Sequence, residues 1–150
     1  FLFNHAGSPW LTQYWSRQVV RKVYGDLSPE AGYSGDEDQG LMGALAVLMK
    51  IGIFSMDGGT SARPVYEIGS PVFDKVVIEL DPNYYPGKEI RISTQNQGEE
   101  SYYVQSASWK GKEHDQCWIF HDEFIKGGEL ILNMGDRPNE NWGVANPVPE

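Results

Sequence analysis

Apolar side chains recur at every fourth position near the start of the chain, which is the spacing of one face of an α-helix. The positions in this stripe are Leu11, Trp15, Val19 and Val23. Ser8 is a typical N-cap, Pro9 suits the first helical position, and Gly25 is a stop signal. The pattern predicts an amphipathic helix over residues 8–25, with the stripe, including Trp15, packed in a core.

The next apolar segment, residues 41–54, shows no polar face, and a polar loop with several glycines precedes it. Such a segment predicts a helix that Asp38 or a neighbour caps and that ends near Lys50. A helix that is apolar nearly all round is buried on most of its sides. Two helices of this kind cannot cover each other completely, so we expect further helices outside these 150 residues.

The pattern changes after residue 63 to short runs that are rich in β-branched and aromatic residues and separated by turn signals. These runs are residues 66–71, 75–80, 88–94, 101–109, 117–125 and 129–134. They predict a small antiparallel β-structure, with one helical turn possible within residues 121–130. The expected organisation is an α+β chain with helices in residues 1–63, β-structure in 64–136 and a coil tail in 137–150.

Charge and composition narrow the class of protein. The chain has 21 acidic and 12 basic residues, a formal charge of −9, which repels phosphate backbones and anionic membrane surfaces. We therefore expect no nucleic-acid partner. Cys117 is the only cysteine, which excludes an internal disulfide and a cysteine-based zinc site. No apolar run is long enough for a membrane span, and the first residues lack an initiator Met and a signal-peptide pattern, which suggests a piece of a longer protein.

Three acidic residues, Asp36, Glu37 and Asp38, directly precede the second helix. Free backbone N–H groups and the positive end of the helix dipole hold a carboxylate ionised at such a position. An ionised, fixed carboxylate suits a general base or a ligand of a hard cation, but acidic residues in this position also commonly serve only as caps. An EF-hand loop is excluded, because Gly40 and Val47 occupy positions where that loop needs ligands. Trp10 and Tyr33, which flank the two loops near the cluster, are candidates for a substrate rim.

Three segments also resemble a known family: "AGSPW" (residues 6–10), "GDEDQG" (35–40) and "IGSPVFDKV" (68–76). Together and in this order, they are similar to the C-terminal part of glycoside hydrolase family 92, the calcium-dependent exo-acting α-mannosidases. The resemblance covers nearly the whole chain. It implies that the predicted helices are the last helices of an (α/α)6 barrel, followed by the small antiparallel β-structure.

The resemblance also implies a function: hydrolysis of terminal α-mannosides of glycans, such as α-1,2-linked mannose, with inversion at the anomeric centre. By carry-over from the family's acidic box, Asp38 is the general base that activates water, and Asp36 is its partner. Gln39 stands where the family usually has Cys. The general acid and the calcium ligands are expected upstream of Phe1, so the resemblance places no metal ligand within this chain.

Several further expectations follow from the resemblance. The partners are a mannose-containing glycan and the missing N-terminal portion of the same enzyme, the cofactor of the complete enzyme is calcium, and the location is secreted or periplasmic. The fragment alone is expected to be inactive. An alternative from another class is a non-catalytic carbohydrate-binding or structural β-module, whose sugar platform would be built from aromatic residues of the β-half. Those residues are Tyr102, Tyr103, Trp109 and Trp118.

Overall fold

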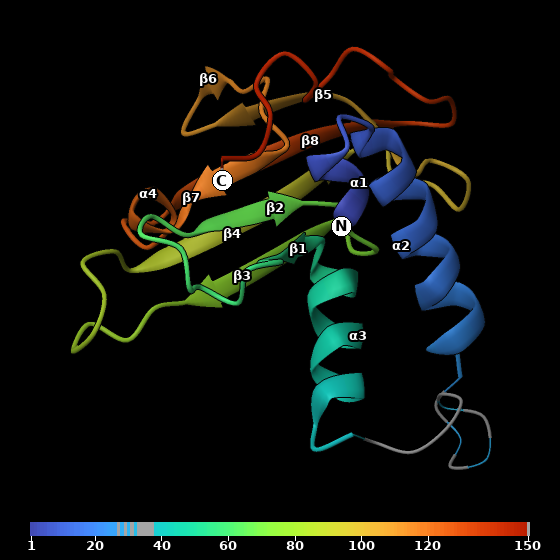
Figure 1. Ribbon diagram of the computed structural model, residues 1–150, viewed down its shortest axis with the longest axis horizontal. Coiled ribbons are helices and arrows are strands. Elements are labelled where there is room, and N and C mark those ends of the chain that lie inside the picture. The colour runs from blue at the N-terminus through green and yellow to red at the C-terminus, as the bar shows by residue number, and fades with distance from the viewer. Residues whose placement is uncertain (27, 29, 31, 33–37, 150) are drawn as a thin grey trace.

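The computed structural model describes every residue except 27, 29, 31, 33–37 and 150. Figure 1 shows two long helices standing beside a body made of β-strands. The helices are α1 (Leu2–His5), α2 (Pro9–Val23), α3 (Leu41–Ile51) and α4 (His121–Phe124). The strands are β1 (Ile53–Phe54), β2 (Val65–Ile68), β3 (Lys75–Glu79), β4 (Glu89–Gln95), β5 (Tyr103–Trp109), β6 (Lys112–Glu113), β7 (Trp118–Phe120) and β8 (Gly128–Gly135).

The first predicted helix is confirmed. α2 begins at Pro9 with Ser8 as its N-cap, and it ends at Val23, two residues before Gly25. Gly7, at φ +70°, makes the left-handed bend between α1 and α2 that a residue with a side chain rarely adopts. The motif "AGSPW" is therefore the turn and the first helical residues that start α2.

The face of α2 that packs on the rest of the chain differs from the predicted one. Its buried residues are Pro9, Thr12, Gln13, Ser16 and Val20. Val19 and Val23 of the predicted stripe pack against the small cluster between α2 and α3. Trp15 is 49% exposed, so the prediction that Trp15 lies in the core is wrong for these 150 residues. Periodicity located the apolar face correctly, but it could not tell which surface that face meets.

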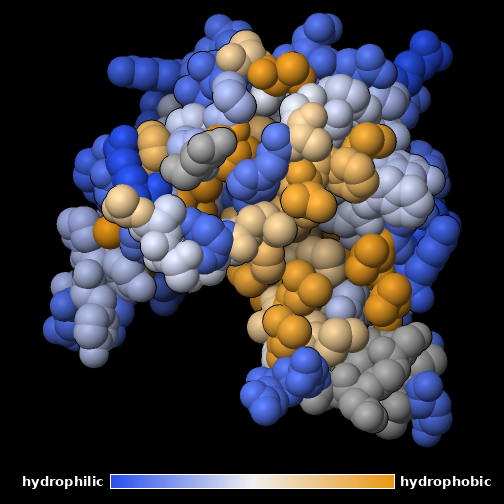
Figure 2. All heavy atoms as spheres, in the orientation of Figure 1, coloured by the Kyte–Doolittle hydropathy of each residue, from blue (hydrophilic) through white to orange (hydrophobic). Residues whose placement is uncertain are grey.

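The second helix also leaves apolar surface uncovered. In α3, only Ala46 and Met49 are buried, whereas Leu41 and Val47 are each 55% exposed. Figure 2 shows apolar side chains gathering over this helix. A small cluster that includes Val20, Tyr24, Ala46 and Met49 joins α2 to α3. Burial of α3 on most of its sides is thus not achieved within the described residues.

Each of the six predicted runs overlaps one strand, although β2, β4 and β8 extend one residue beyond their runs, and the predicted helical turn is α4. Two short strands were not predicted: β1, directly after α3, and β6, which closes a hairpin with β5. The strands form a three-stranded sheet in the order β1-β2-β7 and a five-stranded sheet in the order β3-β4-β8-β5-β6. Because β1 pairs with β2, the small sheet joins residues on both sides of residue 63.

The large sheet is mixed, whereas the sequence predicted an antiparallel structure. β8 lies between β4 and β5 and pairs parallel with β4 and antiparallel with β5. A strand inserted between two neighbours that run in opposite directions must be parallel to one of them. The order of insertion depends on the tertiary fold, so the local pattern gave no sign of it.

The main core lies where the two sheets meet. Its buried residues come from both sheets and include Ile53, Ile68, Ile90, Ile92, Val104, Ile119, Leu130 and Leu132. The tail beyond residue 136 is coil, as predicted, but it packs on this body: Trp142 is 4% exposed, and its indole N–H donates to the His114 carbonyl at 3.0 Å. The tail therefore contributes to the fold.

The contact between the helices and the sheets is polar. Asn4, Thr12, Gln13, Ser16, Glu67 and Ser70 are all buried. The amide side chain of Gln13 accepts a hydrogen bond from the Val104 N–H at 3.0 Å, next to an irregularity in the β5–β8 register. Val104 itself stays paired with Met134, and Gln105 is the residue that the irregularity leaves without a partner in the ladder. Gln13 provides the side-chain acceptor for the buried Val104 N–H.

We expect Gln13→Met to lower the free energy of unfolding by about 1–3 kcal/mol, because it keeps the volume but leaves the buried Val104 N–H without an acceptor. Urea unfolding of the purified protein measures the change. Gln18→Met, on the same helix and outside the buried face, is the matched control and should change stability by less than about 0.5 kcal/mol. Equal effects of the two substitutions would show that the hydrogen bond contributes nothing.

The segment "IGSP" is the junction at which the helices meet the small sheet. The Gly69 N–H donates to the Gly52 carbonyl at 2.9 Å, and a Cβ on Gly69 would lie 2.8 Å from the Phe1 ring. The Pro71 carbonyl accepts from the side chains of Arg17 and Gln97. The start of this third motif therefore makes packing contacts that fix where α2 and α3 leave the sheet.

Candidate functional site

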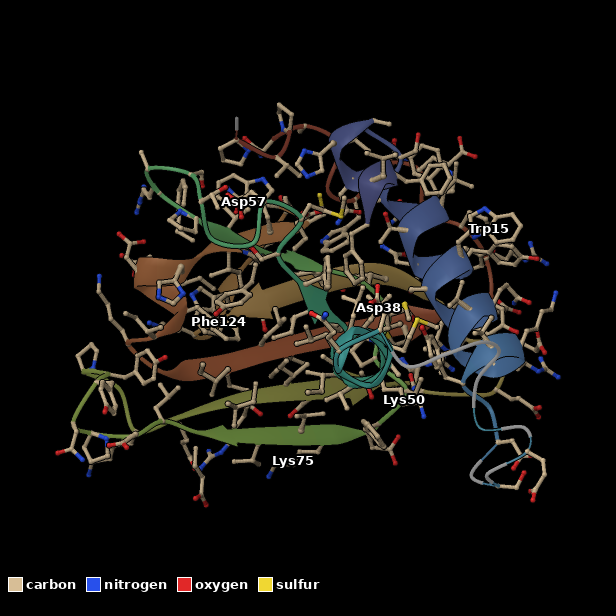
Figure 3. All side chains as sticks on the ribbon, turned by 60° about the horizontal axis from the view of Figure 1, so that its bottom comes forward. Trp15, Asp38, Lys50, Asp57, Lys75 and Phe124 are labelled. Atoms are coloured by element: carbon tan, nitrogen blue, oxygen red, sulfur yellow. The ribbon has the colours of Figure 1, made fainter. Side chains whose placement is uncertain are left out.

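Of the three acidic residues at positions 36–38, the structure describes Asp38, which lies beside the start of α3 (Figure 3). Its side chain is exposed, and its backbone carbonyl accepts a hydrogen bond from the Leu41 N–H at 2.9 Å. The N-cap of α3 is Gly40, in the left-handed conformation at φ +87° and ψ −2°. Gly40, and not Asp38, therefore occupies the N-cap position of α3. Asp38 takes part in the turn through its backbone carbonyl.

Asp36, Glu37 and Tyr33 lie outside the described residues. Their predicted roles, Asp36 as the partner of Asp38 and Tyr33 at a substrate rim, stay predictions. Trp10 is half-buried in the first turn of α2, whereas the connection that carries Asp38 leaves from the last turn. The length of α2 between them is about 20 Å at 1.5 Å per residue. These 150 residues therefore do not bring Trp10 next to Asp38, and its role at a rim also stays a prediction.

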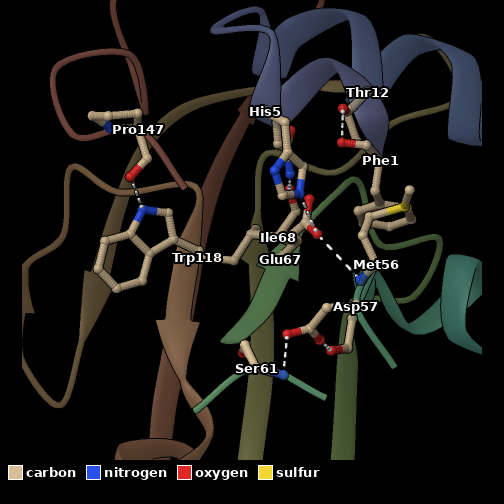
Figure 4. Close-up of polar contacts among 12 residues, drawn as sticks. Phe1, His5, Thr12, Met56, Asp57, Ser61, Glu67, Ile68, Trp118 and Pro147 are labelled. Atoms are coloured by element: carbon tan, nitrogen blue, oxygen red, sulfur yellow. Dashed lines mark hydrogen bonds and ion pairs between the residues drawn. The ribbon is translucent and has the colours of Figure 1, made fainter. Parts of the chain in front are cut away.

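A buried carboxylate that the sequence did not single out lies at the other end of the helices. The side chain of Glu67 is 1% exposed, and its Oε1 accepts from His5 Nε2 at 3.1 Å and from the Met56 N–H at 3.3 Å (Figure 4). Its Oε2 has no partner among the described residues. Burial, together with the nearby charge of Glu67, raises the pKa of the Cys117 thiol to about 12. This cysteine is therefore an inert core residue.

A second carboxylate faces the same region from the loop after β1. Asp57 accepts hydrogen bonds from the Ser55 hydroxyl at 2.8 Å, from the Gly59 N–H at 2.8 Å and from the Ser61 N–H at 3.2 Å. These donors hold the pKa of the Asp57 carboxyl well below its usual range. Glu67 and Asp57 line a cavity of about 150 Å³, together with His5 and Ser61. The only sequence signal for Glu67 was an acidic residue inside a predicted strand.

These groups do not form a calcium site. Over the described part of the chain, no three His, Cys, Asp or Glu side chains come together in a way that holds a metal ion. Calcium in proteins takes six to eight oxygen ligands, several of them carboxylates. The described residues do not meet this requirement, so no chemical step is assigned to the ion below.

The four aromatic residues of the alternative reading do not share one platform. Tyr102 is 7% exposed, and its hydroxyl donates to Glu100 Oε2 at 2.6 Å. Trp109 stacks on Phe124, with ring centroids 6.0 Å apart, and the Trp118 N–H donates to the carbonyls of residues 146 and 147. Tyr103 contacts Tyr102 at the start of β5, whereas Trp109 and Trp118 line a cleft of about 240 Å³ at the other end. Each ring is thus engaged in local packing.

Comparisons with known proteins agree with this geometry. The sequence profile described as "Glycosyl hydrolase family 92 catalytic domain" matches residues 1–136. The structure superposes on the GH92 α-mannosidase BT3965 of Bacteroides thetaiotaomicron with a TM-score of 0.84 and 28% sequence identity, covering 95% of this chain and 18% of that one. The inverting GH92 mannosidase BT2199 of the same organism gives a TM-score of 0.80 and 36% identity, with the same coverages.

A curated relative is described as an uncharacterized secreted glycosidase of Arthroderma benhamiae, and it is 32% identical over 99% of this chain and 18% of its own length. The matched part is a piece of a glycoside hydrolase catalytic domain. The chain belongs to glycosyl hydrolase family 92, which confirms the resemblance of its three motifs. It spans about a fifth of the length of the relatives that it matches. No helix among the described residues is long and apolar enough to cross a membrane.

Proposed function

We propose that this chain is the C-terminal part of an inverting, calcium-dependent exo-α-mannosidase that removes terminal mannose, such as α-1,2-linked mannose, from glycans. The observation that supports this most is the match of residues 1–136 to the family's catalytic domain, together with the likeness to solved α-mannosidases. For one of those mannosidases, a complex with mannoimidazole is known. In the proposed enzyme, α2 and α3 are the last helices of an (α/α)6 barrel, whose remaining helices cover the apolar surfaces described above.

Asp38 acts in this proposal as the general base, with Asp36 as its partner. An inverting glycosidase holds its base roughly 6.5–9.5 Å from the general acid, so that a water molecule fits between the base and the anomeric carbon. Asp38 takes a proton from that water as its oxygen attacks. The general acid, supplied from upstream of Phe1, gives a proton to the leaving oxygen. Asp38 is exposed in this chain, so the rest of the enzyme must supply the walls that exclude bulk water.

Calcium belongs to the proposal as a cofactor of the complete enzyme, bound by residues upstream of this chain. When bound, a hard cation of this kind supplies electrostatic stabilisation to sugar hydroxyl oxygens. The proposed location is secreted or periplasmic, supported by the naming of one relative as a secreted glycosidase. No second function is proposed, because the four aromatic residues divide into two pairs at opposite ends of β5 and form no common platform.

The test is hydrolysis, by the full-length enzyme, of an α-1,2-mannobiose whose reducing end is blocked as a methyl α-glycoside, followed by proton NMR, so that the free mannose observed comes only from the cleaved terminal residue. We expect β-mannose to be released first, because inversion converts the α-linkage to the β-anomer. Removal of calcium with a chelator should abolish the activity, and added calcium should restore it. The 150-residue chain alone should release no mannose. Initial release of α-mannose would overturn the inverting mechanism, full activity in chelator would overturn the calcium dependence, and mannose released by the short chain would overturn the division of roles.

A further inference from the structure

The chain reverses direction between Asp38 and α3 in one tight turn. Gln39 has φ +55°, and Gly40 has φ +87° and ψ −2°. The Leu41 N–H donates to the Asp38 carbonyl at 2.9 Å, which is the hydrogen bond that closes a four-residue turn. Positive φ at both central residues, with this bond, defines a type I′ turn. The first helical hydrogen bond, from the Ala44 N–H to the Gly40 carbonyl at 3.0 Å, follows directly.

This turn has a conformational cost. A left-handed residue other than glycine costs about 1–2 kcal/mol, and Gln39 is neither Gly nor Asn, the residues that favour this turn. A Cβ on Gly40 would meet no atom of the described residues within 4 Å, so no packing contact among them demands glycine there. Among the described residues, glycine at position 40 is therefore favoured by the positive φ of the backbone. This backbone conformation sets the direction in which the chain passes from residue 38 into the helix.

We propose that the Gln39–Gly40 turn positions the Asp38 carboxylate, and that Gly40 is a positioning residue of the enzyme; as regards the reaction, this rests on the proposed function. The closing hydrogen bond of the turn and the start of α3 share residues 38–41, so the turn is joined directly to the helix. α3 is in turn anchored at its other end by Gly52 and Pro71. The helix thus connects the sheet to the turn that carries Asp38. A residue other than glycine with a positive φ is in a sparsely populated conformation, and such residues cluster at active sites.

The chain provides a matched control. Lys110 and Gly111 join β5 to β6 with φ +52° and +76°, and Trp109 pairs directly with Lys112, so this two-residue hairpin loop has the same pattern of positive φ. A Cβ on Gly111 also meets no atom within 4 Å. Gly40→Ala and Gly111→Ala therefore add the same kind of backbone strain without a clash, but only the first substitution lies next to Asp38. Gly40→Asn is the conservative variant, because Asn tolerates the left-handed region.

The experiment compares the full-length enzyme and these three variants by crystal structure, by thermal unfolding and by the kinetics of α-mannoside hydrolysis. In Gly40→Ala we expect the Asp38 carboxylate to move by about 1 Å or more and kcat to fall roughly 10- to 100-fold, with KM within about twofold. Gly40→Asn should keep kcat within about threefold of the parent, since Asn tolerates the left-handed conformation and preserves the turn. Gly111→Ala should lower the melting temperature as Gly40→Ala does, with Asp38 and kcat unchanged.

An Asp38 carboxylate that stays in place in Gly40→Ala would overturn the inference, whether or not the parent hydrolyses mannosides. An equal loss of kcat in Gly111→Ala would also overturn it, because the effect would then be general destabilisation. A displaced Asp38 in a parent that releases no mannose would support the geometric part and contradict the proposed function. The two conclusions are therefore separable.

Discussion

Asp38→Asn in the full-length enzyme should lower kcat roughly 10²- to 10⁴-fold, which is the usual contribution of a positioned general base. The amide keeps the shape of the side chain but cannot accept the proton of the attacking water. The fold should be unaffected, because Asp38 is exposed and its hydrogen bond to Leu41 is made by the backbone carbonyl. Steady-state hydrolysis of an α-mannoside measures the loss, and circular dichroism reports the fold.

The matched control for this prediction is Glu30→Gln. Glu30 is another exposed acidic residue of the connection between α2 and α3, and its neutralisation removes the same charge from the same loop. We expect its kcat to stay within about twofold of the parent, because a distant exposed charge is screened by salt. If Asp38→Asn retained near-normal turnover, or if Glu30→Gln lost as much, Asp38 would have no place in the mechanism.

Gly52→Ala should lower the free energy of unfolding by roughly 2–5 kcal/mol, from left-handed strain and overpacking together. Gly52 ends α3 at φ +86°, where its N–H donates to the Leu48 carbonyl at 2.9 Å. A Cβ there would lie 2.5 Å from Cγ of Pro71, a ring that cannot rotate away. The junction of α3 with the sheet would have to open, and chemical denaturation measures the cost.

Gly58→Ala separates the two causes of that loss. Gly58 also has a positive φ, +61°, but a Cβ there meets nothing within 4 Å. Gly58→Ala should therefore lower the free energy of unfolding only by the cost of the left-handed conformation, about 1 kcal/mol. A similar loss in both variants would mean that contact with Pro71 adds nothing and that the junction is not tightly packed.

The glycines of the three family motifs have different roles. Gly7 allows the left-handed bend between α1 and α2. Gly69 allows close packing where the helices meet the sheet, since a Cβ there would contact the Phe1 ring. A Cβ on Gly40 would contact none of the described residues. "AGSPW" and "IGSPVFDKV" are accordingly architectural in the described chain, and "GDEDQG" is the motif in which a backbone requirement coincides with the proposed catalytic carboxylate.

The sequence alone located most elements, because capping residues, turn residues and apolar spacing are local signals. Ser8 and Pro9 marked the start of α2, and each of the six predicted runs overlaps a strand. It also indicated the family through motif order, which the comparisons confirm. The candidate base was found only because an acidic box stands before a helix and resembles the family's box. Periodicity and charge by themselves favoured capping over catalysis for the acidic residues before α3.

The tertiary structure determined the features that depend on residues distant in sequence. It placed β8 parallel to β4, turned Gln13 instead of Trp15 toward the sheet, and buried Glu67 against His5. None of these follows from local pattern, because strand insertion, the choice between two faces of a helix and the pairing of a buried charge are set by residues far away in sequence. The path of Gln39 and Gly40 is also a matter of backbone angles, and these appeared only in the folded chain.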